Sequence, residues 1–407
     1  MKIPFSPPFI NDSVKNEVMD SLESGWITTG PKVKKLESQI AELTKAPQVL
    51  CVNSWTSGAI LMLKWFGVKP DDEIILPAYT YSATALAVIH AHATPIMVDV
   101  SEDFNISLNA IEKAITNKTK VIFPVDIAGW PCDYKEINKL VLSKQNLFEA
   151  NNEIQEKLGR ILVISDAAHS IGAKYDGQQT GVLTDVTIFS LHAVKNVTTA
   201  EGGAICLNFP LPFNNEELYN TLRCYSLNGQ TKDAFTKSKA GAWSYDIIYP
   251  GLKINMPDVL AAIGIGQMES YISTALPERV RIFEEYNSHF SEKEWAILPP
   301  YKSNIKQSSC HIYALRIEGV NEEQRDQIIT MISNFDVAVN VHFKPLPLLS
   351  LFKEMGYLIE DYPNAYNQYA NEISLPIYPQ LSSKEITYII KAVCESVEKV
   401  LYAQEKL

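Results

Sequence analysis

The sequence predicts an α/β fold, built on a doubly wound and mostly parallel β-sheet with helices on both faces. Between residues 48 and 208, short apolar runs rich in β-branched residues alternate with longer helix-prone stretches. Continuous apolar runs are typical of strands that are covered on both faces, as in parallel sheets. The composition agrees, because 46% of the 407 residues are hydrophobic and 20% are charged, as in a globular protein with a sizeable core.

The predicted strands follow one another along the chain with room for a crossover helix between most of them. They are QVLCVN (48–53), EIILP (73–77), PIMVDV (95–100), KVIFPVD (120–126), ILVISDA (161–167), VTIFSL (186–191) and AICLN (204–208). The polar, helix-prone segment 140–160 is longer than a crossover requires, and we interpret it as a surface elaboration without a catalytic part.

The pattern changes after about residue 250. A helix is expected over 258–286, a strand in the alternating run HIYALRI (311–317), and an amphipathic helix from Ser383 onward. We therefore predict two domains, a large one over residues 1–250 and a smaller C-terminal α/β domain over 251–407.

Charge and composition disfavour several classes of protein. The formal net charge of −11 opposes binding to nucleic acids and to anionic membranes. The chain has no apolar run near the roughly 18 residues of a membrane span, and MKIPFSPPFI at its start lacks the apolar stretch of a secretory signal. The six cysteines are scattered, with no His–Cys cluster at metal spacing, so we predict reduced thiols, no metal site and a cytoplasmic location.

Candidate chemical residues follow the predicted strands where each one ends. They are Asn53 and Ser54, Tyr79 to Tyr81, Asp166 and His169, and Ser190, His192 and Lys195. Ligands of doubly wound sheets bind beyond the carboxyl ends of the strands, so one site is expected to collect these side chains.

Lys195 carries the most information about function. It lies in SLHAVKNVTTAEGG (190–203), on a predicted turn beside a strand. A lysine there is well placed to form a Schiff base with an aldehyde cofactor, whereas the plainer interpretation is a solvated surface charge. To attack a carbonyl the amine must lose its proton, which burial promotes, and once released it can serve as a general base.

Asp166 and His169 lie in DAAHSIGA (166–173), at the end of an apolar run. A buried carboxylate needs a cationic or hydrogen-bonded partner, and a pyridinium N–H is one; the alternative is a helix cap. His169 is expected either against a cofactor ring or as space-filling.

Two further segments suggest how a flat, phosphorylated cofactor is held. NSWTSGAI (53–60) places hydroxyls and N–H groups at a predicted helix N-terminus, which suits a phosphate but also describes an ordinary N-cap. In PAYTYSAT (77–84), Tyr81 can stack on a heterocycle or pack in the core.

The motifs NSxTSG, PxYTYxAT, SDAAHSIG, SLHAVKNVTTAEGG and GLKINMPDVLAAIG together resemble the DegT/StrS group of nucleotide-sugar aminotransferases, which are pyridoxal-phosphate (PLP) enzymes of fold type I. The similarity extends from WITTGPKVKKLE (26–37) to SLPIYPQLS (374–382). The resemblance implies PLP as cofactor, with Lys195 as the catalytic lysine that binds it covalently. It further implies cofactor contacts from Thr56, Ser57, Tyr81, Asp166, His169, Ser190 and Asn255.

The same resemblance implies a homodimer with shared active sites, to which Lys253 and Asn255 are contributed by the partner subunit. The implied reaction moves an amino group from glutamate to the C4 ketone of a nucleotide-linked 4-keto-6-deoxy sugar, for surface polysaccharide or glycan biosynthesis. Lys253-Ile254-Asn255 is similar to the Lys-x-Asn form of enzymes that act on UDP-linked sugars, and favours a UDP-N-acetylhexosamine derivative. His342, in VHFKPLP, is a candidate substrate contact or a packed loop histidine.

Three alternatives remain open from the sequence. A non-catalytic PLP-binding regulator of the same fold keeps the cofactor residues, and a PLP enzyme of another type, such as a sugar dehydratase, shares the fold. The dehydratase branch has histidine in place of the lysine, and Lys195 argues against it. A nicotinamide-linked oxidoreductase is disfavoured, because no G-x-G-x-x-G opens a helix after an early strand.

Overall fold

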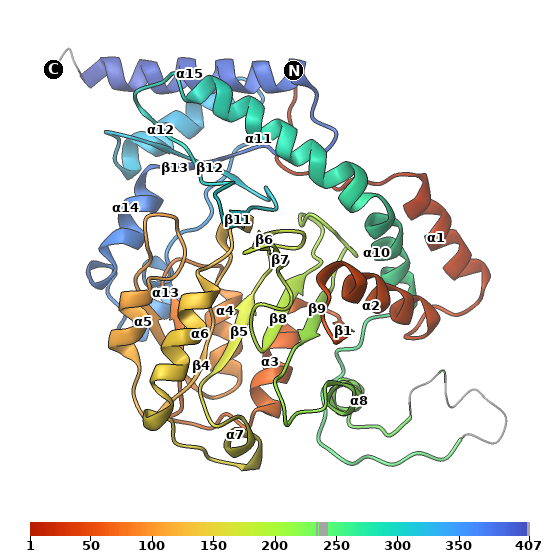
Figure 1. Cartoon of the computed structure of the whole chain (residues 1–407). Coiled ribbons are helices and arrows are strands. Elements are labelled where there is room, and N and C mark those ends of the chain that lie inside the picture. The colour runs from red at the N-terminus through yellow and green to blue at the C-terminus, as the bar shows by residue number, and fades with distance from the viewer. Residues whose placement is uncertain (233–234, 236–242, 405–407) are drawn as a thin grey trace.

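A seven-stranded sheet forms the centre of the computed structural model, which describes residues 1–232, 235 and 243–404 (Figure 1). The strand order is β1-β9-β8-β5-β4-β2-β3. β9 is antiparallel to both of its neighbours and the other pairs are parallel. The strands are β1 (Gln48–Val52), β2 (Glu73–Pro77), β3 (Thr94–Val98), β4 (Thr119–Ile122), β5 (Leu162–Asp166), β8 (Val186–Ser190) and β9 (Gly203–Leu207). Each coincides, within a few residues, with a predicted apolar run, and the α/β class with a mostly parallel sheet is confirmed.

Helices cover both faces of the sheet because successive strand residues point to opposite sides. Val52 and Ile188 face the side covered by α3, while Cys51 and Phe189 face the side covered by α2 and α10. Further along the sheet, Ile75 packs with α5 and α6 on this second side. The covering helices are α2 (Pro31–Thr44), α3 (Trp55–Trp65), α4 (Ala83–His90), α5 (Leu108–Ala114), α6 (Tyr134–Ser143), α7 (Glu153–Leu158), α8 (Asn215–Tyr225) and α10 (Asp258–Ser270).

The predicted helix over 258–286 is divided in the structure. α10 is followed by a π-helical turn, Tyr271–Ala275, and by α11 (Leu276–Phe290). Pro277 lies in the first turn of α11 and has no N–H to continue the preceding helix, so the backbone hydrogen-bond pattern is interrupted here. The Tyr271 hydroxyl donates to the carbonyl of Ile171 at 2.6 Å, which ties this turn to the loop after β5.

A second hydrophobic core lies under the C-terminal elements. It joins buried residues of the three-stranded sheet β10-β12-β13 to α11, α12 and α15, and the N-terminal residue Ile3 belongs to it as well. The new elements are β10 (Ala296–Ile297), β12 (Tyr313–Ile317), β13 (Glu372–Leu375), α12 (Glu322–Ser333) and α15 (Ser383–Gln404). The strand and the final helix expected here are present, and the division at residue 250 stays a prediction.

The remaining elements are short or peripheral. They are α1 (Asp12–Glu23), α13 (Ser350–Glu354), α14 (Pro363–Asn371), the 3-10 turns η1 (Ile127–Gly129), η2 (Gln145–Leu147), η4 (Leu346–Leu348) and η5 (Ile359–Asp361), and the strands β6 (Lys174–Tyr175), β7 (Gln178–Gln179) and β11 (Lys306–Gln307). No helix within the described residues is long and apolar enough to span a membrane.

Candidate active site

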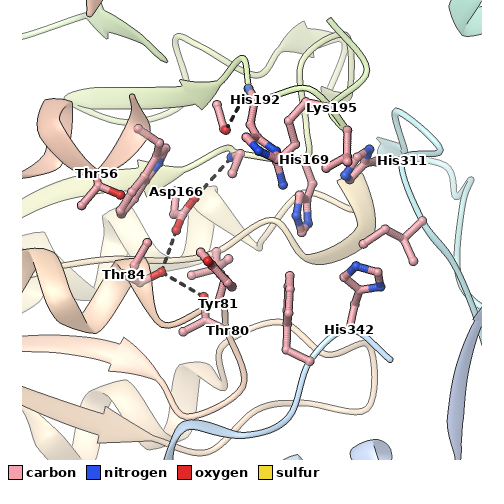
Figure 2. Close-up of a pocket in the computed structure, with 18 of the residues that line it drawn as sticks. Thr56, Thr80, Tyr81, Thr84, Asp166, His169, His192, Lys195, His311 and His342 are labelled. Carbon is pink, nitrogen blue, oxygen red and sulfur yellow. Dashed lines mark hydrogen bonds between the residues drawn. The ribbon is translucent and has the colours of Figure 1, made fainter. Parts of the chain in front are cut away.

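A cavity of about 460 Å³ opens where the carboxyl ends of β1, β2, β5 and β8 meet. This is the usual ligand position of an open α/β sheet. Most of the predicted site residues line it: Thr56, Tyr81, Asp166, His169, Ser190, Lys195 and His342. Figure 2 shows three imidazoles on one side of the cavity, those of His169, His311 and His342, with Thr56, Thr84 and Asp166 on the other.

Lys195 projects into this cavity from the loop after β8 (Figure 2). The Lys195 N–H donates to the carbonyl of His192 at 2.9 Å, which closes a turn, and the Thr199 N–H donates to the carbonyl of Leu191 at 2.9 Å. Burial lowers the pKa of Lys195 to about 8, although the charge of Asp166 acts in the opposite direction. A substantial share of the amine is therefore neutral and nucleophilic near physiological pH.

Asp166 ends β5 and is 5% exposed. One carboxylate oxygen accepts a hydrogen bond from the Thr84 hydroxyl at 2.8 Å, and the other accepts from the Ala168 N–H at 3.2 Å. Burial raises the pKa of Asp166 to about 7, while these two hydrogen bonds and the charge of Lys195 lower it. A cation held against the carboxylate would restore full ionisation, which is what a protonated pyridine nitrogen supplies.

The start of α3 forms a polar corner of the cavity. Ser54 caps the helix by accepting from the Ser57 N–H at 3.1 Å, and Ser54, Trp55 and Thr56 line the cavity. A Cβ atom on Gly203 of β9 would lie 2.6 Å from the Ser54 carbonyl carbon, so only glycine allows β9 to pass this close. The indole N–H of Trp55 is buried and has no hydrogen-bond partner among the described residues. A helix N-terminus favours an anionic group such as phosphate.

Aromatic and imidazole rings line the rest of the cavity. The His169 ring lies 5.7 Å from Phe343 in a stacked arrangement and 4.5 Å from the His311 ring. Nδ1 of His169 accepts from the Ala128 N–H at 3.3 Å, and burial holds the pKa of His169 well below its usual range. Tyr81 is 62% exposed at the cavity mouth, with its ring 5.8 Å from Phe343. These neutral rings suit a flat ligand.

Three predicted site residues lie elsewhere in this chain. The Ser57 hydroxyl contacts Ser54 Oγ at 2.8 Å and does not line the cavity. Asn255 donates to the Thr29 hydroxyl at 2.6 Å, and Lys253 is exposed. The roles expected of Lys253 and Asn255 require a partner subunit, and they stay predictions.

The sequence reasoning gave no role to several residues that the structure brings into the cavity. Thr84 holds Asp166, although it was part of the quoted motif PAYTYSAT. Phe5 stacks on the His342 ring at 5.4 Å, and His311 lies beside His169. Phe5 comes from the N-terminal segment and His311 from the C-terminal part, and no periodicity links either one to the strand ends.

The residues present fit pyridoxal phosphate. An amine of lowered pKa, a buried carboxylate that needs a cation, and a helix N-terminus with an unpaired indole N–H match its aldehyde, its ring nitrogen and its phosphate.

Comparisons with known proteins agree with this geometry. The model of the DegT/DnrJ/EryC1/StrS aminotransferase family matches residues 8–394. The spore coat polysaccharide biosynthesis protein SpsC of Bacillus subtilis is 33% identical over 404 residues, covering 97% of both chains. The UDP-4-amino-4-deoxy-L-arabinose–oxoglutarate aminotransferase of Shewanella sediminis is 31% identical, covering 97% of this chain and 98% of its own.

A solved structure extends the likeness to three dimensions. The putative sugar aminotransferase Spr1654 from Streptococcus pneumoniae, in its PMP form, is 43% identical with a TM-score of 0.94, covering 98% of this chain and 100% of its own. Its PLP form matches with the same TM-score. The predicted fold type I and the predicted cofactor, pyridoxal phosphate, are thereby confirmed.

Proposed function

The chain belongs to the DegT/DnrJ/EryC1/StrS aminotransferase family, and from this premise we propose that it transfers an amino group from glutamate to a nucleotide-linked keto-sugar. The acceptor atom is the C4 ketone of a 4-keto-6-deoxy sugar. The observation that carries the proposal is that the Lys195 amine and the Asp166 carboxyl share one cavity with the hydroxyls of Thr56 and Ser190.

The substrate class is supported by two relatives and by one motif. The name of the Shewanella sediminis relative specifies a UDP-linked amino sugar and oxoglutarate, and that of the Bacillus subtilis relative specifies polysaccharide synthesis. The Lys253-Ile254-Asn255 sequence of this chain supports a UDP-N-acetylhexosamine derivative. The product would enter surface polysaccharide or glycan synthesis.

Pyridoxal phosphate, when bound, supplies an aldehyde that accepts and releases the amino group and a ring that withdraws electrons. The Lys195 Nζ would hold the cofactor through its aldehyde carbon, for which the lowered pKa of Lys195 provides the neutral amine. With glutamate in the site, the same Nζ would serve as the general base that moves a proton from the substrate carbon. Overall, glutamate and the keto-sugar would be converted to oxoglutarate and the amino sugar.

The other predicted side chains bind and orient. Asp166 would hold the protonated ring nitrogen as an ion pair at the buried end of β5. Thr56 and Ser190 would hold the phosphate near the start of α3. Ser57 does not line the cavity in this chain, so its hydroxyl would reach the phosphate only after turning away from Ser54. His169 and Tyr81 would bind the ring. His342 contacts the substrate from the C-terminal side of the cavity.

The proposal includes a homodimer in which Lys253 and Asn255 complete the site of the partner subunit. Asn255 lies beside the polar corner of its own chain, because the Asn53 N–H donates to the Ile254 carbonyl at 2.7 Å. The segment is therefore held at the edge of the site region with Lys253 exposed. We also propose the division into domains 1–250 and 251–407, and a cytoplasmic location supported by six free thiols.

The test is to incubate the protein with PLP, glutamate and a panel of 3-keto and 4-keto nucleotide sugars, and to weigh the products. An amine on a UDP-linked 4-keto sugar is expected, with one oxoglutarate formed per sugar aminated. The Lys195→Ala variant serves as the matched control. An amine formed only from 3-keto sugars, or only from dTDP-linked sugars, contradicts the proposed substrate.

A further inference from the structure

His342 lines the cavity on the side formed by the C-terminal part of the chain (Figure 2). The backbone N–H of His342 donates to Glu372 Oε2 at 3.0 Å, and its backbone carbonyl accepts from the Tyr79 hydroxyl at 2.7 Å. The Phe5 ring stacks on the imidazole at 5.4 Å with planes 19° apart. Backbone and ring are both fixed, so what His342 offers a ligand depends on which ring nitrogen carries hydrogen.

A chain of hydrogen bonds leads from the imidazole to a buried carboxyl. Nδ1 of His342 lies 2.9 Å from Ser374 Oγ, and the Ser374 hydroxyl in turn contacts Glu372 Oε1. Glu372 and Ser374 are two residues apart on β13, so their side chains emerge on the same face of that strand. Both are fully buried. Nε2 has no hydrogen-bond partner within the described part of the chain.

A serine hydroxyl has one proton, so Ser374 couples the protonation of Glu372 to that of the His342 ring. When Glu372 is ionised, the Ser374 hydroxyl donates to the carboxylate, because charged acceptors make the stronger bond. Nδ1 then has to carry hydrogen, and Nε2 is left with a lone pair. When Glu372 is protonated, it donates to Ser374 Oγ, Ser374 donates to Nδ1, and the hydrogen is on Nε2.

We propose that Glu372, acting through Ser374, sets the tautomer that His342 presents to the substrate. Glu372 and Ser374 are positioning residues, and His342 is the group in contact. With Glu372 protonated, Nε2–H donates to an anionic or carbonyl oxygen of the substrate. Ionisation moves one proton from Glu372 to Ser374 Oγ and one from Ser374 to Nδ1, while one leaves Nε2. The role at the substrate rests on the proposed function; the coupling does not.

The burial of Glu372, opposed by its neighbours, places its ionisation in the working range of pH. Burial raises the pKa of Glu372 to about 8, while Ser374, the His342 N–H and the guanidinium of Arg325 on α12 act in the opposite direction. Arg316 is paired with Glu372 across β12 and β13, and the Tyr79 hydroxyl donates to the backbone carbonyl of His342.

The imidazole itself stays neutral throughout this range. Burial, assisted by the charge of Lys195, lowers the pKa of His342 to about 3. His169 and His311 are held well below their usual pKa values by burial, so they are neutral as well. Raising the pH through 8 therefore changes the tautomer of His342 and leaves its charge unchanged.

Nitrogen NMR of the PLP-loaded protein, labelled with ¹⁵N-histidine, tests the proposal directly. The signals of His342 are assigned by their loss in His342→Gln, and tautomers are read from two-bond couplings between pH 6.5 and 9.5. Hydrogen is expected on Nε2 at the low end and on Nδ1 at the high end. Glu372→Gln should keep it on Nε2 throughout, since the amide donates to Ser374 at every pH.

Ser374→Ala removes the link without altering the carboxyl, and should abolish the pH response of His342. The matched control is Glu37→Gln, which alters a buried carboxyl of raised pKa on α2. This variant should leave the pH response of His342 unchanged. A tautomer that does not change with pH in the unaltered protein overturns the proposal. So does a response that survives in both Glu372→Gln and Ser374→Ala.

Kinetics separate this proposal from the proposed function. The KM of the substrate bound by His342 should rise about 10-fold above pH 8, as expected for one lost hydrogen bond to a charged group, and Glu372→Gln should remove that rise with kcat little changed. If no sugar is aminated but the tautomer still switches, the coupling stands and the substrate assignment fails. A rise in KM that persists in Glu372→Gln assigns it to another group and overturns the role at the substrate.

Discussion

Lys195 and Asp166 are shifted in opposite directions by the same cause. Burial lowers the pKa of the amine to about 8 and raises that of the carboxyl to about 7, because each charged form is poorly solvated in the cavity. The two groups partly compensate each other electrostatically. A bound cofactor would supply a cation for the Asp166 carboxylate and an aldehyde for the neutral Lys195 amine.

Replacing Lys195 with alanine should abolish turnover and the covalent attachment of PLP, since no other amine lines the cavity among the described residues. Borohydride reduction followed by tryptic mapping should label the peptide around residue 195 only in the unaltered protein. Circular dichroism should show an unchanged fold. Normal turnover by the variant would contradict the role of Lys195.

Thr84→Val should weaken PLP binding about 10-fold at pH 7.5, because it removes a hydrogen bond to a charged carboxylate. Absorbance titration of the apo-protein with PLP measures the change. Thr80→Val is the matched control: the Thr80 hydroxyl contacts Thr84 at 2.9 Å but not Asp166, so a smaller loss is expected. Equal losses in the two variants would show that the Thr84–Asp166 bond is unimportant.

At the scale of elements, the site depends on the close approach of β9 to the start of α3. Gly203 pairs with Val52 on one side and with Ser190 on the other, directly behind the polar corner. A side chain at residue 203 would displace the N-terminus of the helix that holds Thr56. The glycine thus serves the binding site through backbone packing alone.

Gly203→Ala should lower the free energy of unfolding by about 2 kcal/mol, a typical penalty for overpacking, and should also weaken PLP binding. Denaturant unfolding and PLP titration measure the two effects. Gly319→Ala is the comparison, because its φ of +78° strains alanine by about 1 kcal/mol while nothing lies within 4 Å of the new Cβ. If PLP affinity falls equally in both variants, the effect of residue 203 is one of stability only.

For the whole molecule, the proposed dimer makes a quantitative prediction about mixed subunits. Lys195→Ala and Asn255→Ala should each be inactive alone. Unfolding and refolding them together in equal amounts should restore about a quarter of wild-type activity, because half of the dimers are mixed and one of their two sites is intact. If light scattering shows dimers but no activity returns, Asn255 acts in the site of its own subunit or has no role in the reaction.

The buried carboxyls make the apo-protein less stable as the pH rises from 6.5 to 8. Burial raises the pKa of Glu37 and Asp166 to about 7 and that of Glu372 to about 8, so the folded state holds protons that the unfolded state has already lost. Their stabilisation is complete below the unfolded pKa values near 4 and disappears as the pH passes the folded ones.

Chemical unfolding of the apo-protein should therefore show a loss on the order of 2 kcal/mol between pH 6.5 and 8. The histidines of lowered pKa contribute mainly below about pH 6.5, where the unfolded state binds protons that the folded state does not; above it both states are neutral. Lys195, whose pKa is lowered to about 8, acts in the opposite direction over this range by a smaller amount. Glu37→Gln removes one of the three carboxyls and should make the dependence shallower. A stability that is flat or rising over this range would contradict the buried, protonated state of these groups.

The sequence alone determined the sheet and most of the side chains at the ends of its strands. β-branched apolar runs are a local signal, and parallel strands bring their carboxyl ends together by rule, so Asp166, Ser190 and Lys195 could be assigned to one site before any coordinates. The cofactor followed from the resemblance of five ordered motifs to the DegT/StrS group, because Lys195 and Asp166 taken singly left plainer interpretations open.

Only the tertiary structure decided which distant segments complete the cavity. Phe5, His311, and the Glu372–Ser374–His342 chain lie far from the strand ends in sequence, and their meeting depends on how the second core packs against the sheet. The same holds for protonation, since the pKa values of Lys195 and Asp166 follow from burial by neighbours rather than from the residues themselves. Local patterns specify elements, whereas desolvation and long-range contacts exist only in the folded chain.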